Sequence, residues 1–217
     1  MQVRGAARAT AETRGAQISD HGKPPRPKRG RPATASAEDV LRVVREQYLA
    51  GDRVDVSVVA RELGLGRATI YRWFGSREGL ISEVVYLEFE ALLERKRQRV
   101  NGSVGAAWLL EVLDGVNRVL SRSTALRRLL EQERELGLRL LTSSGGSVQP
   151  RVVASIQALI DEQVAAGAYQ PMASPETLAF ALVRLMEAFL YNDAVVGIRG
   201  DHERMREVQA ALLGVRR

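Results

Sequence analysis

The sequence contains no cysteine and only two histidines, and aromatic residues make up 5% of its 217 positions. Disulfides and thiolate metal sites are therefore excluded, and a reducing, cytoplasmic location is expected. Neither His21 nor His202 stands near a candidate nucleophile or at a zinc-ligand spacing. No apolar run approaches the roughly 20 residues of a membrane span, and no signal-peptide stretch opens the chain. These absences argue against an enzyme and predict no metal, no cofactor and no membrane partner.

Positive charge is concentrated at the beginning of the chain. Residues 1–32 hold eight Lys and Arg residues against Glu12 and Asp20, so their balance of +6 equals the net charge of the whole sequence. The other residues are balanced in charge, which excludes a uniformly basic coat for nucleic acid. A second, local group of cations lies in residues 61–77 and consists of Arg61, Arg67, Arg72 and Arg77.

The basic arm, residues 1–32, has two interpretations. Its segment Lys23–Pro32 is rich in proline and arginine, so it should be extended and solvated on its own. It could serve only as a solubilising tail. Alternatively, Arg29-Gly30-Arg31-Pro32 resembles an AT-hook, in which glycine lets the backbone enter a narrow minor groove where arginines meet enhanced negative potential. We favour contact of Arg29 and Arg31 with DNA.

Residues 55–77 have the pattern of a helix, a tight turn and a second helix. The first helix has an apolar face at helical spacing, made of Val56, Val59, Ala60 and Leu63. Gly64 can end it in the left-handed region without steric cost. Ile70 and Phe74 form the apolar underside of the second helix. The groups left to face outward suit a phosphate-lined groove, and they are Arg67, Ala68, Thr69, Tyr71, Arg72 and Trp73.

A helical hairpin that only packs on its neighbours would show a similar short pattern. The surrounding sequence therefore has to distinguish such a hairpin from a DNA-binding helix-turn-helix. A capped helix precedes the pair, a long helix follows it, and the basic arm lies upstream. The segment resembles the DNA-binding domain of the TetR family of transcriptional regulators. Ala60, Gly64 and Ile70 match the small, turn and core positions of that domain. Residues 71–80 resemble its Y-x-x-F-x-s-K-e-x-L run, with Arg77 where lysine is usual.

Caps and periodicity predict an all-α chain. Ser36 and Asp39 form a capping-box pattern, Gly51 closes that helix, and Asp55 and Ser76 are expected to cap later ones. A long helix follows Ser76, and further helices are expected at about 103–121, 124–141, 148–167, 175–197 and 201–214, the last capped by Asp201. This gives an N-terminal three-helix helix-turn-helix bundle joined by a long helix to a larger helical ligand-binding and dimerisation domain. The expected divisions are 1–32 for the arm, 33–80 for the DNA-binding domain and 81–217 for the second domain.

The segment 175–197 is apolar nearly all round, so a helix there must be buried on two sides. It could be the central helix of a monomeric bundle. The resemblance instead implies a homodimer, because members of that family associate through their last two long helices, here about 175–197 and 201–214. A dimer would also place two recognition helices about 34–36 Å apart, which matches successive major grooves.

Polar side chains interrupt this apolar surface at Arg184, Glu187, Tyr191, Asn192 and Asp193. Since buried polar groups cost free energy unless they are paired, these residues line a pocket, pair across a dimer or lie at an exposed end. Tyr191-Asn192-Asp193 resembles part of a C-terminal signature of the quorum-sensing-degradation regulators, a branch of the family, and the similarity is diffuse over residues 100–213. This resemblance implies a lactone or acyl inducer. The residues expected in a ligand pocket, each of which also suits an ordinary core, are Trp108, Leu136, Leu140, Met186 and Tyr191.

The sequence therefore indicates a one-component transcriptional regulator, with repression the favoured direction, that leaves double-stranded operator DNA when a small-molecule inducer binds. Arg67, Thr69 and Arg72 are expected to read base edges, and Arg29 and Arg31 to reach the minor groove. The residues expected to hold phosphates are Ser57, Tyr71, Trp73 and Arg77. Two alternatives remain open at this point. An architectural DNA-binding protein would need no cavity, and an enzyme on a helical scaffold would need a cleft with convergent ionisable groups.

Overall fold

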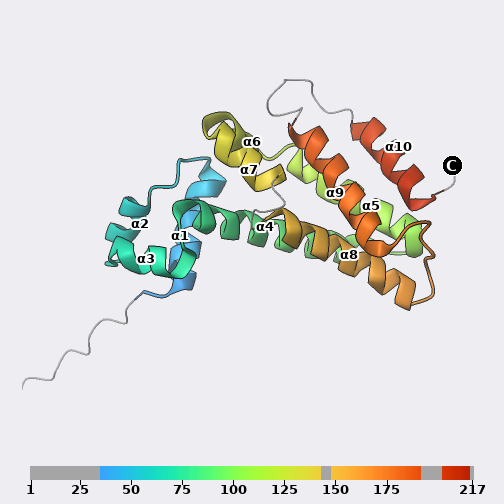
Figure 1. Cartoon of the computed structure of the whole chain (residues 1–217), viewed down its shortest axis with the longest axis horizontal. Coiled ribbons are helices and arrows are strands. Elements are labelled where there is room, and N and C mark those ends of the chain that lie inside the picture. The colour runs from blue at the N-terminus through green and yellow to red at the C-terminus, as the bar shows by residue number, and fades with distance from the viewer. Residues whose placement is uncertain (1–34, 143–147, 192–201, 216–217) are drawn as a thin grey trace, which may run out of the picture. The chain divides into compact units, whose positions relative to one another are not determined.

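The computed structural model describes residues 35–142, 148–191 and 202–215, without the side chains of Leu141, Thr142 and Tyr191. Within these residues the chain forms ten helices and no strand, which confirms the all-α prediction (Figure 1). The helices are α1 (Ala37–Ala50), α2 (Val56–Glu62), α3 (Arg67–Phe74), α4 (Arg77–Arg99), α5 (Gly105–Leu120), α6 (Thr124–Gln132), α7 (Arg134–Thr142), α8 (Gln149–Ala165), α9 (Pro175–Tyr191) and α10 (His202–Leu213). Predictions that lie outside the described residues concern Arg29, Arg31, Asp201, the side chain of Tyr191 and positions 192–197 of the expected long helix.

Side-chain caps set the boundaries of the first helices, as the sequence predicts. The Ser36 hydroxyl accepts a hydrogen bond from the Asp39 N–H at 3.2 Å, and the Asp39 carboxylate accepts one from the Ser36 N–H at 2.9 Å. Helix α1 ends at Gly51, whose φ of 75° is left-handed. The side chains of Asp55 and Ser76 cap α2 and α4 in the same way. These ends depend on neighbouring residues alone, which is why the sequence suffices to place them.

Helices α1, α2 and α3 pack together on the first half of α4, and the second half of α4 continues along α5 and α8 (Figure 1). The residues at the centre of the first group are fully buried and include Val40, Val44, Val59 and Leu80. Because α4 runs through both groups without interruption, the division expected at residue 80 falls inside a helix and stays a prediction.

The expected single helix over 124–141 is wrong, since α6 and α7 are separate helices. Glu133 lies between them with φ −128° and ψ 53°, outside the helical region. Leu130 and Leu136 are both buried, yet at about 100° per residue they would face different sides of one straight helix. Gly137 allows the two helices to pack closely, because a Cβ there would lie 2.6 Å from Cδ2 of Leu130. The break thus lets both leucines reach the core.

The C-terminal half is built around α8 and α9, which pack along each other, and α10, which packs on α5 and α9. Asn117 of α5 donates a hydrogen bond to Gln209 of α10 at 3.0 Å, and both side chains are buried. None of the described helices is both long enough and apolar enough to cross a membrane.

Gly105 joins the beginning of α5 to the turn after α8. Its φ is 60°, and a Cβ there would lie 2.1 Å from the carbonyl oxygen of Ala168. We therefore expect Gly105→Ala to lower the free energy of unfolding by about 2 kcal/mol. Gly167 has a similar φ of 68° but open space around it, so Gly167→Ala should cost about 1 kcal/mol or less. Urea unfolding measures both, and equal losses would show that the contact with Ala168 is unimportant.

Candidate functional site

The turn between α2 and α3 has the geometry that the sequence predicts. Val56, Val59 and Ala60 are buried in α2, and Gly64 adopts a left-handed φ of 64°. The N–H of Leu65 then donates a hydrogen bond to the Ala60 carbonyl at 2.8 Å, which closes the turn. Ile70, 1% exposed, fixes α3 to the core through its underside.

The opposite side of α3 is open to solvent. Arg67, Ala68, Arg72 and Trp73 are exposed, whereas Thr69 and Tyr71 are half-buried. In the part of the chain that the structure describes, neither the Arg67 nor the Arg72 guanidinium forms a hydrogen bond or ion pair. Two unpaired cations on one short exposed helix leave their donors available to an anionic partner.

Ser57 and Tyr71 flank this surface in different ways. Ser57 is exposed in the first turn of α2, where its N–H donates to the Asp55 carboxylate at 2.7 Å. The Tyr71 ring packs partly against the core, so it is less accessible than the sequence pattern alone indicates.

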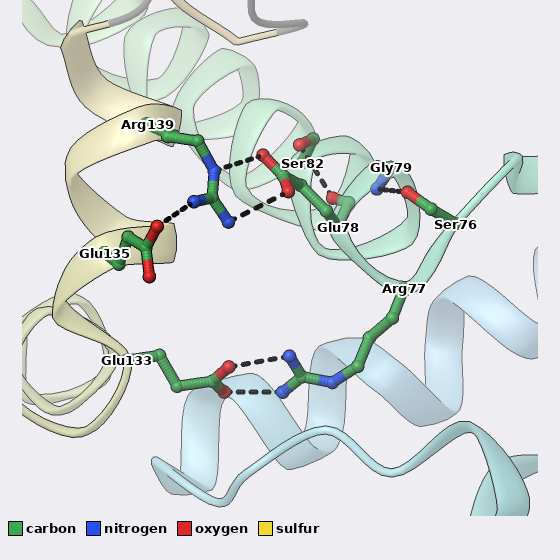
Figure 2. A network of polar contacts seen from close by, with 8 residues as sticks. All are labelled: Ser76, Arg77, Glu78, Gly79, Ser82, Glu133, Glu135 and Arg139. Atoms are coloured by element: carbon green, nitrogen blue, oxygen red, sulfur yellow. Dashed lines mark hydrogen bonds and ion pairs between the residues drawn. The ribbon is translucent and has the colours of Figure 1, made fainter.

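Arg77 does not have the free guanidinium expected of a phosphate contact. Its Nε donates to the Val54 carbonyl at 2.7 Å, and its two terminal nitrogens donate to the Glu133 carboxylate at 2.6 and 2.5 Å (Figure 2). These hydrogen bonds from Arg77 hold the pKa of Glu133 below its usual range. The donors of Arg77 are already used within the chain, which gives this residue a structural role, and its predicted phosphate contact stays a prediction.

A second bridge runs parallel to the first. Arg139 of α7 donates to both carboxylate oxygens of Glu78 at 3.3 Å and also to Glu135 at 2.9 Å (Figure 2). In addition, Arg128 of α6 donates to the carbonyl oxygen of Ala50, the last residue of α1, at 3.0 Å. Helices α6 and α7 are thus tied to the end of α1 and to the first turn of α4, close to the helix-turn-helix.

A cavity of about 260 Å³ lies among α1 and α4 to α9. Its volume is close to the lower end of the range for small-molecule sites. Apolar side chains form most of its wall, and they include Leu49, Phe89, Leu126, Val152 and Leu190. Two of the predicted pocket residues, Leu140 and Met186, line it. Trp108 and Leu136 are buried elsewhere in the core and do not.

Tyr48, Gln149 and Glu187 also line the cavity. The sequence offers a pocket wall as one of three interpretations of Glu187, and it does not predict Tyr48 or Gln149 there. Glu187 interrupts an apolar helix, which was a usable signal. The sequence contains no comparable signal at Gln149, because a glutamine at the beginning of a helix is ordinarily solvated. Tyr48 reads as a core residue of α1, and nothing in its spacing distinguishes a cavity wall from a core.

Glu187 is a buried acid whose carboxylate accepts a hydrogen bond from Arg184 at 3.0 Å. Burial raises its pKa from 4.5 to about 7, against the opposing effect of Arg184. The folded chain therefore holds this proton more tightly than the unfolded chain does. The resulting contribution to stability is present below about pH 4.5 and is lost as the pH rises through 7.

Glu187→Gln cannot ionise, so its stability relative to the original protein should increase with pH. We expect the free energy of unfolding of the variant to differ little from that of the original protein at pH 5 and to exceed it by about 2 kcal/mol at pH 8. Loss of the ion pair with Arg184 offsets part of this gain. Urea unfolding at both pH values measures it, and Glu176→Gln, an exposed position of α9, corrects for the removal of one charge. A difference of the same size at both pH values would contradict the buried acid.

No cluster of three or more potential metal-ligating side chains occurs in the described ranges. Comparison with known proteins then identifies the family. Residues 104–214 match the family described as "Tetracyclin repressor-like, C-terminal domain". The chain belongs to the TetR family of transcriptional regulators.

Individual relatives agree with this assignment. The TetR-family transcriptional repressor QsdR of R. erythropolis is 30% identical with a TM-score of 0.76, over 83% of this chain and 95% of that one. The regulator FadR of Bacillus subtilis, solved with stearoyl-CoA, has a TM-score of 0.51 at 12% identity, over 82% of this chain and 97% of that one, and so shows the fold alone. The uncharacterised HTH-type regulator YhgD of Bacillus subtilis (strain 168) is 22% identical over 144 residues, 63% of this chain and 72% of its own length. The fold and family are those of DNA-binding regulators.

Proposed function

We propose that this TetR-family protein represses transcription by binding double-stranded operator DNA as a homodimer, and that a small molecule in the cavity releases it. The observation that carries the proposal is the exposed face of α3, where Arg67 and Arg72 have no partner among the residues that the structure describes, while nearby Arg77 is neutralised by Glu133. Because operator DNA is in the cytoplasm, we expect the protein there.

Each side chain of the DNA-reading surface has a separate proposed role. Arg67, Thr69 and Arg72 read base edges in the major groove, and Ala68 is small enough to let the helix approach. Ser57 and Trp73 contact phosphates, and Tyr71 does so through its exposed edge. The arm residues Arg29 and Arg31 remain proposed minor-groove contacts.

The dimer is proposed to form through α9 and α10, which pack on each other. Apolar side chains remain exposed on both helices: Phe180 is 47%, Val208 42% and Leu212 37% exposed. Val208 and Leu212 are four residues apart and so share one helical face. Phe180→Glu or Leu212→Glu should convert the dimer to a monomer in light scattering, whereas Met172→Glu, at an exposed position between α8 and α9, should not.

Ligand release is proposed to act through the end of α1. Tyr48 and Leu49 belong to the wall of the cavity, and the next residue, Ala50, is held by Arg128 of α6. A ligand that repositions either helix changes the placement of the helix-turn-helix. A coupling of about 1–3 kcal/mol suffices to change operator affinity about 5- to 150-fold. The resemblance of residues 100–213 to the quorum-sensing-degradation regulators favours a lactone or acyl inducer, and the FadR complex with stearoyl-CoA shows that a similar fold can hold an acyl ligand.

Selection of bound duplexes from a random pool tests the proposal, when repeated with and without small molecules extracted from cells. The expected result is a palindromic site whose binding is lost with the extract. A site that ignores every extract would indicate an architectural DNA-binding protein, and no selected site at low salt would refute the regulatory role.

A further inference from the structure

Few polar groups reach the interior of the cavity. Glu88 is paired with Arg45 of α1, and the hydroxyl of Ser123 accepts the N–H of Leu126 at 3.2 Å. Arg95 is exposed, so its charge lies at the mouth. The other buried side chains of the wall that carry polar groups are Tyr48 of α1, Gln149 at the beginning of α8 and Glu187 of α9. Gln149 and Glu187 lie on neighbouring helices, which pack along each other.

Gln149 is 3% exposed, and its amide nitrogen has no hydrogen-bond partner among the described residues. A buried donor without an acceptor is unfavourable and rare in folded proteins. Its position on the wall of an otherwise apolar cavity means that a ligand carbonyl could supply the missing acceptor.

Glu187 lines the same cavity from the neighbouring helix α9, and its Oε2 accepts from Arg184. The carboxyl group can accept a second hydrogen bond from a ligand through its other oxygen. A ligand carboxylate would meet the like charge of Glu187 whenever that group is ionised, so an anionic head group is disfavoured here.

We propose that the cavity selects an uncharged ligand with an apolar body and a carboxamide group, which is read by Gln149 and Glu187 together. The amide carbonyl accepts from the Gln149 nitrogen, and the amide N–H donates to the Glu187 carboxyl group. An ester has no donor for an ionised Glu187, an alcohol must use one oxygen for both side chains, and a fatty acid is charged, so a carboxamide matches the two side chains best. This inference rests on the proposed inducer site and narrows the proposed lactone or acyl inducer to an acyl amide, so a simple lactone, which is an ester, is not expected to be the preferred ligand.

Four probes of equal chain length test this selection on the unaltered full-length protein: octanamide, methyl octanoate, octan-1-ol and octanoate. Isothermal titration calorimetry in the absence of DNA should rank octanamide first, by at least about tenfold over each of the others, since a site built around hydrogen bonds rejects analogues that lack them. Similar affinities for all four, preference for octanoate, or no binding of octanamide would overturn the proposal.

Two variants test whether Gln149 is responsible for the preference for octanamide. Gln149→Leu should bring the affinities for octanamide and methyl octanoate within about threefold of each other. Gln157→Leu makes the same chemical change elsewhere on α8 and should preserve the tenfold ranking. An unchanged ranking in Gln149→Leu would refute the role of that residue.

The amide selection and the regulatory function can fail separately. If octanamide ranks first in calorimetry but does not release operator DNA, the chemistry of the cavity stands and the inducer role fails. If a cell extract releases the operator but the four probes bind equally, the inducer role stands and the amide selection fails.

Discussion

Replacing both Arg67 and Arg72 with alanine should lower affinity for the selected operator about a thousandfold and leave the free energy of unfolding unchanged. Each arginine is exposed and unpaired within the described chain, so its removal leaves no buried partner behind. A side chain that contacts a base edge contributes about 1–3 kcal/mol, and each 1.4 kcal/mol is a factor of ten. Fluorescence anisotropy with the operator and a scrambled duplex measures the change.

The matched control removes the same charge elsewhere. Arg122 and Arg127 are exposed arginines outside α2 and α3. Replacing both with alanine should lower the affinity for the operator and for the scrambled duplex by less than about tenfold. In single variants, Arg67→Ala should also relax preference at one base position. Equal losses on the operator and on scrambled DNA would contradict base reading by α3.

Arg77→Ala and Glu133→Ala should each lower the free energy of unfolding by about 2–3 kcal/mol. Removal of one partner from a buried ion pair costs about 3–5 kcal/mol, and the value here is smaller because 27% of the Arg77 side chain and 13% of the Glu133 side chain are exposed. The double variant should lose little more than either single variant, since the second change removes the charge left unpaired by the first. Urea unfolding of the four proteins measures this coupling.

Glu135→Ala is the control for the Arg77 pair, because Glu135 is 90% exposed and bonds only at the edge of the same network. Its effect on stability should be small. If Arg77 instead contacts a phosphate, Arg77→Ala will lower the slope of log affinity against log salt concentration by about one, since one fewer counterion is released on binding. In that case Glu133→Ala will leave the free energy of unfolding unaltered. That pair of results would restore the role that the sequence pattern suggested.

The features that were predictable from the sequence are those that depend on near neighbours. The cap formed by Ser36 and Asp39, the end of α1 at Gly51 and the buried position of Ile70 each follow from residues within one or two turns. For the same reason the exposed face of α3 was predictable, because helical spacing fixes which residues share a side once one of them is buried.

The features that were not predictable depend on residues far apart in sequence. Arg77 belongs to a matching motif, but its partner Glu133 lies 56 positions away, and no local pattern shows that they meet. The break at Glu133 was missed because both flanking segments have good helical composition. The cavity combines Tyr48 with Gln149 and Glu187, residues more than 30 positions apart that only the tertiary arrangement of their helices brings to one wall.

Methylation interference tests the DNA-reading role of α3 most directly. Dimethyl sulfate modifies N7 of guanine, which faces the major groove, and N3 of adenine, which faces the minor groove. If the exposed face of α3 enters the major groove in each half of a dimer, the interfering guanines will form two groups about 10 base pairs apart, or a multiple of this spacing. Interference confined to adenines, or binding that no guanine modification weakens, would contradict that role.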